Sequence, residues 1–402
     1  MEGIELEQAV ELLLEKAIAP KETEEVALLE ALGRTLAEDM RAAFDNPPFD
    51  RSPLDGYAII ASDTVHATKK TPARLHIIGE ECAGDFFAGV VKPGEALRIM
   101  TGGAMPKGTD AVIRQEDVSV KDKFVEIPYE LRRHENYCFA GEDIKKGALL
   151  IRQGEVLDAP RIGVLASQGH AKVTVFRRPR IVLGNTGDEL LHPGEPLSPG
   201  KIYNSNLYLL AARLQELGAE TRNLDIIPDD PKEAADKLRL HLDWSDLLIT
   251  TGGVSVGKKD IMHEVASLLP AQRIFWKVQM KPGYPLLAYE TGNALGLALS
   301  GNPFAAYTTF ELIARPLIDH LAGHAPRSFP RLEATLKDAF PKASHGRRFI
   351  RAHYDTAEGT AAIPGQHSSG SLFSAVGCNA FIDLPPGTGK LNPGDKVDIL
   401  LL

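Results

Sequence analysis

The chain has 402 residues, of which 44% are hydrophobic and 25% charged, and it carries a net charge of −9 at pH 7. This length suits several domains with their own cores, and the composition is that of an ordinary globular protein. The acidic balance excludes a general nucleic-acid or acidic-membrane binder, because such proteins need a basic surface.

The cysteines and the first residues indicate the compartment. Cys82, Cys138 and Cys378 lie far apart and form no CxxC pair, so neither a disulfide framework nor a zinc site is expected. The opening MEGIELEQAVELLLEKAIAP is acidic and amphipathic, whereas a signal peptide needs a basic start and an unbroken apolar core. No stretch approaches the ~20 apolar residues of a membrane span. We therefore expect a soluble, cytoplasmic protein with no membrane partner and no nucleic-acid partner.

The first part of the chain combines helical stretches with short strands. Residues 1–43 have the pattern of two helical stretches, which end before the turn-rich NPPFDRSPLDG. Residues 57–130 hold short alternating segments separated by Gly and Pro, and this pattern predicts a small β-rich unit. Residues 145–177 return to strands punctuated by Gly and Pro, together with a short helix.

From Arg180 the chain alternates between strands and helices, which predicts an α/β domain with a mainly parallel sheet. The strands are set by apolar runs and the helices by periodicity and capping residues. In order, the segments are a strand at 180–185, a helix over 204–218, a strand near 221–227, a helix opening at Asp230-Pro231 and a strand over 247–251. After about Pro326 short strands return, which predicts a small terminal β domain.

The loop TTGGVSVGKKD follows the strand over 247–251 and matches most of a phosphate-binding P-loop. Gly252, Gly257 and Lys258 have the P-loop spacing. The P-loop then needs Ser or Thr, whose hydroxyl binds Mg²⁺, but this chain has Lys259. The loop therefore indicates phosphate binding and disfavours a P-loop ATPase. Asp260, the next residue, could hold a metal instead.

Acidic residues also follow two other strands of the predicted sheet. Asp188 and Glu189 come after the first strand, and Asp229 lies at the end of another. Ligands of such sheets bind beyond the carboxyl ends of the strands, where backbone N–H groups suit phosphate and carboxylates suit Mg²⁺. Taken alone, the loop with Asp188 and Glu189 or the loop TTGGVSVGKKD is more typical of a solvated turn with acidic caps. Together they favour a cleft for a phosphorylated ligand and a divalent cation.

Further polar segments are weaker signals. Lys277 and Lys281 would share one face of a strand and could neutralise an anion, or they could be surface lysines. The turn SGNP opens a helix, whose amide-rich start suits an anion. The segments HGRRFIR (345–351) and HSSGS (367–371) could together grip an oxyanion, or they could belong to exposed hairpins.

Several motifs in a fixed order resemble those of the molybdopterin molybdotransferase family, which includes bacterial MoeA and the E domain of gephyrin. The motifs are NPPFDRSPLDGYA, RIMTGGAMPKGTDAVI, GEDI, NTGDELL, SDLLITTGGVSVGKKD, KPG and SGNP. The resemblance covers essentially the whole chain. It implies an elongated helical linker domain (1–43 and 145–177), an inserted β-rich domain (44–144), an α/β molybdopterin-binding domain (178–325) and a C-terminal β-barrel (326–402).

The resemblance implies a reaction and a set of site residues. The reaction inserts molybdate into adenylylated molybdopterin with Mg²⁺ and releases AMP and molybdenum cofactor. The protein would be a homodimer and could meet the adenylylating enzyme of the same pathway. The implied catalytic residues are Asp55, Thr101, Asp143, Lys277, Lys281 and Ser369, the first three from the partner's inserted domain. Cofactor-binding residues would be Thr186, Gly187, Asp188, Asp229, Gly252, Gly253, Ser255, Gly257 and Asn302, and Glu189 and Asp260 would bind the metal.

Four positions depart from the family pattern. The family commonly has Lys at Tyr284, Pro at Ser300, Ser at Ala305 and Arg at Cys138, and losing cations and a hydroxyl should weaken oxyanion binding. One alternative is therefore a catalytically weak paralogue that acts as a molybdopterin-binding carrier or scaffold. Another is a CinA-like nucleotide pyrophosphatase, whose resemblance would be confined to the α/β domain. The intact acidic set favours the active transferase.

Overall fold

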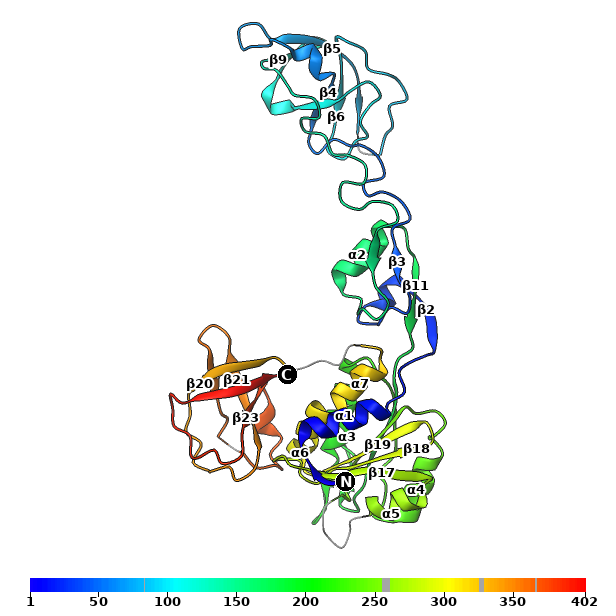
Figure 1. The fold of residues 1–402 in the computed structure, drawn as a ribbon, viewed down its shortest axis with the longest axis vertical. Helices are drawn as coiled ribbons and strands as arrows, with labels where there is room; N and C mark the ends of the chain where they lie inside the picture. The colour runs from blue at the N-terminus through cyan, green and yellow to red at the C-terminus, as the bar shows by residue number, and fades with distance from the viewer. Residues whose placement is uncertain (83, 255–260, 325–328, 366) are drawn as a thin grey trace.

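The computed structural model describes all residues except 83, 255–260, 325–328 and 366. The molecule is elongated, with a β-rich sheet at one end and an α/β domain beside a small barrel at the other (Figure 1). A narrow region that contains one helix connects the two ends. The sequence-based prediction of an α/β domain combined with β-rich units and a terminal barrel is confirmed.

The α/β domain is built on a seven-stranded sheet with the order β1-β17-β18-β19-β16-β12-β15. The pairs β12/β15, β12/β16, β16/β19 and β1/β17 are parallel, and β18 is antiparallel to both of its neighbours. The strands are β1 Glu2–Ile4, β12 Arg180–Asn185, β15 Glu220–Asn223, β16 Leu247–Thr251, β17 Ala271–Val278, β18 Leu287–Thr291 and β19 Ala294–Leu299. A short pair, β13 Leu190–Leu191 and β14 Ile202–Tyr203, lies outside this sheet.

Helices cover both faces of this sheet, and each face has its own apolar core. One core includes residues of α1 Leu6–Lys16, α3 Ser205–Glu216, α6 Pro303–Thr309, the π-helical turn Phe310–Ala314 and α7 Arg315–Leu321. The other includes residues of α4 Pro231–Arg239 and α5 Met262–Leu268. Asn204 and Asp230 begin α3 and α4 by accepting hydrogen bonds from Leu207 N and Glu233 N, as N-caps do.

The start of the chain differs from the expectation of two helical stretches in the linker domain. The strand β1 pairs with β17, and α1 buries Leu6, Ala9 and Leu13 in the α/β core, so this segment packs with the α/β domain. The second stretch forms the strand β2 Thr23–Ala27, which pairs with β11 Lys172–Phe176. Local helical periodicity is overridden there because pairing with a distant strand satisfies the backbone hydrogen bonds, although in β2 only Val26 is half-buried.

The connecting region has a small core of its own. Its elements are β2, a 3-10 turn at Leu28–Ala31, β3 Met40–Arg41, β10 Leu149–Ile151, α2 Ala159–Ser167 and β11. Asp158 caps α2 by accepting a hydrogen bond from Arg161 N at 3.0 Å. The chain leaves this region after β3 and returns before β10, so the β-rich domain is an insertion.

The inserted domain and the terminal domain are both β structures. The inserted sheet has the order β7-β4-β6-β5-β9-β8, and the terminal domain is a closed barrel with the order β20-β22-β21-β23-β24. The inserted strands are β4 Gly56–Ile59, β5 Ala73–Glu81, β6 Glu95–Ile99, β7 Ala111–Arg114, β8 Ser119–Lys121 and β9 Phe124–Ile127, with 3-10 turns at Ala61–Thr64 and Gln115–Asp117. The barrel strands are β20 Arg331–Leu336, β21 Arg348–Asp355, β22 Thr360–Ala362, β23 Ala380–Leu384 and β24 Lys396–Leu401, with a 3-10 turn at Phe373–Ala375.

Candidate functional site

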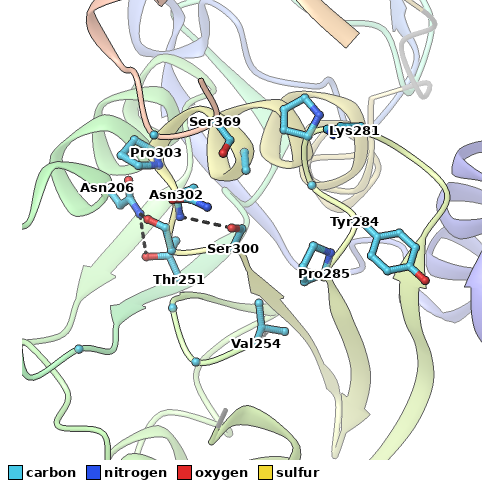
Figure 2. A pocket seen from close by; sticks show the side chains of 18 of the residues that line it. Asn206, Thr251, Val254, Lys281, Tyr284, Pro285, Ser300, Asn302, Pro303 and Ser369 are labelled. Carbon is cyan, nitrogen blue, oxygen red and sulfur yellow. Dashed lines mark hydrogen bonds between the residues drawn. The ribbon is translucent and has the colours of Figure 1, made fainter. Parts of the chain in front are cut away.

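A cavity of about 1050 Å³ lies where the carboxyl ends of the central strands face the barrel. Its walls come from the loops after β12, β16 and β19, from the segment between β17 and β18, and from two barrel segments (Figure 2). The polar and small residues that line it include Thr186, Gly187, Glu189, Asp229, Gly252, Gly253, Lys281, Tyr284, Ser300, Asn302, His345, Arg347, Arg348, Ser369 and Gly370.

The loops after β12 and β16 lie side by side because these parallel strands end in register. Asn185 is opposite Thr251 in the ladder, and Thr186 N donates a hydrogen bond to Thr251 O at 2.9 Å. Gly252 has φ +93°, and a Cβ placed on it would lie 2.4 Å from the carbonyl oxygen of Thr186. Only glycine fits this close approach. The two loops that the sequence analysis placed at one edge of the sheet therefore meet in one cavity wall.

Amide side chains fix the turn after β19 against the same wall. Asn206 donates a hydrogen bond to the carbonyl oxygen of Gly301 at 2.9 Å and a longer one to Thr251 Oγ1 at 3.4 Å. The hydroxyl of Ser300 accepts a hydrogen bond from Asn302 N at 3.3 Å (Figure 2). Asn206 was not among the predicted site residues, and its amide in the first turn of the predicted helix was the available signal.

Among the described residues, the carboxylates of Glu189 and Asp229 line the cavity. Asp188 lies next to them, since its Oδ1 accepts a hydrogen bond from Asp229 N at 3.1 Å and its carbonyl accepts one from Lys201. Carboxylate oxygens are the donors that Mg²⁺ prefers, so the chemistry of these groups suits magnesium. The described residues contain no ready-made cluster of three or more metal-binding side chains. Ser255, Gly257 and Asp260 lie outside the described residues.

Cations line the opposite side of the cavity, where the barrel meets the segment after β17. Lys281 N donates to Arg347 O at 3.0 Å, and Phe349 N donates to Lys281 O at 2.8 Å, so this backbone pairing joins the two domains. Arg347 binds both carboxylate oxygens of Asp383 and also contacts Glu7 at 2.8 Å. Hydrogen bonding to Asp383 is the largest of the effects that raise the pKa of Arg347, whereas burial lowers the pKa of Arg348.

Lys277 behaves differently from Lys281. The two lysines do not share one strand face, because Lys281 lies beyond the end of β17 and Lys277 has a left-handed backbone. The ammonium of Lys277 lies 2.8 Å from the carboxylate of Glu2, and Lys277 does not belong to the described lining of the cavity. Of the two predicted lysines, the structure places Lys281 in the cavity wall and pairs Lys277 with Glu2.

A barrel loop carries Ser369 and Gly370 into the cavity. Arg351 on β21 is only 1% exposed and donates to the carbonyl oxygens of Ser368 and Ser371 at 2.8 Å each. Its guanidinium lies 3.7 Å from the ring centroid of Phe304 in α6. Ser369 O also accepts a hydrogen bond from Phe304 N at 3.0 Å. Buried contacts therefore hold the loop against the α/β domain. The sequence pattern did not distinguish Arg351 from the neighbouring Arg347 and Arg348.

The predicted residues of the inserted domain lie far from this cavity within one chain. Asp55 directly precedes β4, and its Oδ1 accepts two hydrogen bonds of 2.7 Å from the backbone and hydroxyl of Thr101. These bonds lower the pKa of Asp55, with the backbone bond the larger cause. Asp143 accepts a hydrogen bond from Asn46 Nδ2 at 3.0 Å. The strands β4 and β6 stand at the opposite end of the molecule from the α/β domain (Figure 1).

Three of the four residues that were expected to depart from the family pattern line the cavity. Tyr284 is half-exposed on the side of Lys281, Ser300 holds the turn after β19, and Ala305 lies in α6. Cys138 lies in the inserted domain, where its backbone forms a bridge with Arg51. The residue types at Tyr284, Ser300 and Ala305 therefore contribute directly to the chemistry of the cavity wall.

Comparison with protein families finds three matches in chain order. Residues 4–169 match the MoeA N-terminal region (domain I and II), residues 185–320 match a probable molybdopterin binding domain, and residues 333–402 match the MoeA C-terminal region (domain IV). In the described residues, no helix has the length and apolar character needed to cross a membrane.

Whole-length relatives carry one name. The chain is 38% identical over 388 residues to the molybdopterin molybdenumtransferase of Bacillus subtilis (strain 168), covering 95% of this chain and 90% of that protein. It is 35% identical over 402 residues to the protein of the same name from Staphylococcus epidermidis (strain ATCC 12228 / FDA PCI 1200), covering 99% and 95%. The crystal structure of the molybdopterin biosynthesis moeA protein from Pyrococcus horikoshii OT3 has a TM-score of 0.85 and 30% identity, covering 100% of each chain.

Proposed function

The chain belongs to the molybdopterin molybdenumtransferase family, and we propose that it inserts molybdate into adenylylated molybdopterin, releasing AMP and molybdenum cofactor. A role in molybdenum cofactor biosynthesis follows from relatives that match nearly the whole chain. This whole-length match disfavours a CinA-like pyrophosphatase, whose resemblance would be confined to the α/β domain.

One observation carries the proposal: a single cavity combines glycine loops, carboxylates, cations and a hydroxyl-bearing loop. The substrate has a phosphoanhydride link, and molybdate is an oxyanion. The backbone amide of Gly253 suits a phosphate oxygen, whereas that of Gly187 donates a hydrogen bond to Ile227 O at 3.1 Å. Lys281 and Arg348 supply positive charge on the opposite wall. Ser369 presents a hydroxyl from the barrel side, where it would hydrogen-bond the molybdate.

We assign substrate binding to the loops after the central strands. Thr186, Gly187, Gly252, Gly253 and Asn302 would surround the ligand, since all five line the cavity. Asp188, in the loop after β12, and Asp229, in the loop after β15, would orient the ligand, and Asp229 N donates a hydrogen bond to Asp188 Oδ1. Ser255 and Gly257 belong to this proposal by their place in the sequence motif.

The metal is a second part of the proposal. Glu189 lines the cavity and would hold Mg²⁺ together with Asp260. When bound, the ion would neutralise the charge that develops on the departing phosphate. Lys281, on the opposite wall, would stabilise the same negative charge, and Asp229, in the neighbouring loop, would orient the substrate.

A second copy of the chain is a third part. Asp55 and Thr101 are the predicted catalytic pair of the inserted domain, and Asp143 accompanies them, but one chain keeps them away from its own cavity. A homodimer would supply them from the partner, and closed two-fold dimers are the commonest assemblies. We propose this arrangement in a cytoplasmic enzyme that receives its substrate from an adenylylating enzyme of the same pathway.

The domain division is proposed in a modified form. Residues 44–144 would be the inserted domain, and 326–402 the barrel. The linker would comprise 145–177 and the part of 1–43 that follows α1. The α/β domain would comprise 178–325 together with β1 and α1, since both pack in its core.

One assay tests the reaction. Purified protein is incubated with adenylylated molybdopterin, Mg²⁺ and molybdate, and AMP and active cofactor are measured. We expect both products in equal amounts, and neither when the magnesium is removed with a chelator. AMP without cofactor would indicate a pyrophosphatase-like hydrolysis. Tight substrate binding without either product would indicate the carrier or scaffold and would reject the transferase.

A further inference from the structure

An ion pair that no sequence motif predicts holds the ammonium of Lys277 outside the cavity. Its Nζ lies 2.8 Å from Glu2 Oε1 and 3.7 Å from the ring centroid of Trp276, and the side chain is 15% exposed. The backbone of Lys277 has φ +67°, a left-handed conformation that costs a residue with a Cβ free energy. Such a backbone persists only where surrounding contacts impose it.

The same ammonium stands next to the cavity wall. It lies 5.7 Å from the ring centroid of Tyr284, which lines the cavity. Backbone hydrogen bonds join Lys277 N to Leu286 O at 2.8 Å and Val278 N to Tyr284 O at 3.1 Å. Lys277 and this wall therefore belong to one rigid hairpin. Rotation of the lysine side chain past the tyrosine ring would carry its charge toward the ligand without any movement of the backbone.

Glu2 reaches Lys277 because of the sheet register. The strand β1 pairs parallel with β17 and places Glu2 opposite Trp276, one residue from the lysine. The hydrogen bond from Lys277 is the largest cause that lowers the pKa of Glu2, so this carboxylate is ionised at neutral pH. Arg273 and His263 are the other basic groups near Glu2. Burial lowers the pKa of His263, so Arg273 carries the positive charge whose repulsion of the lysine Glu2 offsets.

We propose that Glu2 is a positioning residue that competes with the phosphates of the cavity ligand for Lys277. In the free protein the glutamate keeps the ammonium over the Trp276 ring. When a diphosphate enters the cavity, the lysine exchanges Glu2 for the ligand. The proposal rests on the proposed function only in taking a diphosphate as the ligand. The first strand of the sheet thereby sets the anion affinity of the site.

A neighbouring ion pair supplies a natural comparison. Glu7, in α1, pairs with Arg347 in the cavity wall. Arg347 also has Asp383, which is 5% exposed, as a second carboxylate partner. Removing Glu7 would leave Arg347 tied to Asp383, whereas the described residues give Lys277 no carboxylate partner other than Glu2. Only the loss of Glu2 should release a cation.

The first experiment measures the position of the lysine directly. Wild type, Glu2→Gln and the matched control Glu5→Gln are treated briefly with acetic anhydride, and modification of Lys277 is followed by mass spectrometry. Glu5 is an exposed glutamate of the same segment whose side chain caps no backbone group. We expect Lys277 to react about three-fold faster in Glu2→Gln, since an ion pair with an exposed carboxylate holds the ammonium only weakly, and at the wild-type rate in Glu5→Gln.

The second experiment measures affinity for inorganic pyrophosphate by calorimetry. We expect the Kd to fall about three-fold in Glu2→Gln and to remain unchanged in Glu5→Gln and Glu7→Gln. The gain should vanish in Glu2→Gln combined with Lys277→Met, measured against Lys277→Met alone. If Glu2 acted only through the local structure, Glu2→Gln would still lower the Kd when Lys277 is replaced by Met. All variants are checked for unchanged melting temperature.

The outcomes separate this proposal from the proposed function. An unchanged Kd in Glu2→Gln, or an unchanged rate of Lys277 modification, overturns the competition between Glu2 and ligand. A Kd gain that survives without Lys277 overturns it as well. If wild type does not bind pyrophosphate at all, both the ligand assigned under the proposed function and the competition proposed here are wrong. If wild type and Glu2→Gln both convert adenylylated molybdopterin and bind pyrophosphate with the same Kd, only the competition proposed here is rejected.

Discussion

At the residue scale, the cavity is divided between acidic and basic walls. Glu189 and Asp229 stand on the side of the strand ends, and Lys281 and Arg348 stand on the side of the barrel. This separation suits a ligand whose phosphates bind between a divalent cation and fixed positive side chains. Three residues expected to depart from the family pattern, Tyr284, Ser300 and Ala305, also line this cavity, so their effects can be tested one at a time.

Substitution of Glu189 tests the acidic wall. Glu189→Gln removes one charge and keeps the shape of the side chain, and we expect about a 10- to 100-fold rise in the Mg²⁺ concentration needed for half-maximal AMP release. Glu233→Gln, which changes an exposed glutamate of α4, is the matched control. A Mg²⁺ titration that superimposes on the wild-type curve would remove Glu189 from the metal site.

Substitution of Tyr284 tests the basic wall. Tyr284→Lys adds a cation beside the cavity, and we expect it to lower the molybdate concentration needed for half-maximal cofactor formation by about two- to five-fold. Tyr208→Lys makes the same change at an exposed tyrosine of α3, which does not line this cavity, and should have no effect. If the molybdate requirement stays constant or rises, the tyrosine does not weaken oxyanion binding.

At the element scale, the site depends on two parallel strands that end in register and on the glycines that follow them. The strand β16 is buried along its whole length, and β12 is buried from Ile181 onward, so their positions are fixed by the core. The loops leave these strands in conformations that only glycine adopts without strain. The shape of the cavity wall is therefore a property of the sheet.

Substitution of Gly252 tests this dependence. Gly252→Ala combines a left-handed backbone with a Cβ 2.4 Å from Thr186 O, whereas at Gly200, φ +79°, no atom lies within 4 Å of the added Cβ. Gly200→Ala should cost about 1–2 kcal/mol of stability. Gly252→Ala should cost more and also weaken pyrophosphate binding. Urea denaturation and calorimetry of both variants check this, and equal losses in the two would contradict it.

The elements that the sequence predicted well are those with local signals. Strand 247–251 and the helix opened by Asp230-Pro231 were confirmed because a buried apolar run and a capping pair determine them. The helix predicted over 204–218 is Ser205–Glu216. The glycine loops and Glu189 were likewise placed at one edge by the rule for parallel sheets.

The elements that the sequence predicted badly depend on distant partners. The strand β1 and the burial of α1 arise from pairing with β17, which lies more than half the chain away. The pairing of Lys277 with Glu2 follows from the same contact, and the left-handed backbone of Lys277 lies in the same strand. Periodicity and spacing carry no information about such partners. The predicted alignment of Lys277 with Lys281 was wrong for this reason.

At the scale of the whole molecule, the elongated shape separates the predicted catalytic residues. Asp55 and Thr101 lie at the end opposite the cavity. The narrow connecting region offers few contacts that would fold one end onto the other in the same chain. We therefore expect each site to combine the cavity of one chain with the inserted domain of a second.

Mixing two inactive variants tests this shared site. At a Mg²⁺ concentration that just saturates the wild type, Asp55→Ala and Glu189→Gln are each expected to be nearly inactive as homodimers. After denaturation and refolding together in equal amounts, half of the dimers are mixed and one of their two sites is intact, so about one quarter of wild-type turnover should return. Activity of the mixture no higher than that of the separate variants would place both residues in the site of one chain.

The central claim is that the cavity at the ends of β12 and β16 binds adenylylated molybdopterin. A crystal structure of the protein with that compound tests the claim most directly. We predict the diphosphate link against the Thr186-Gly187 and Gly252-Gly253 loops, with Glu189 on the metal side and Lys281 opposite. Ligand density at any other place, with this cavity filled only by solvent, would contradict the account.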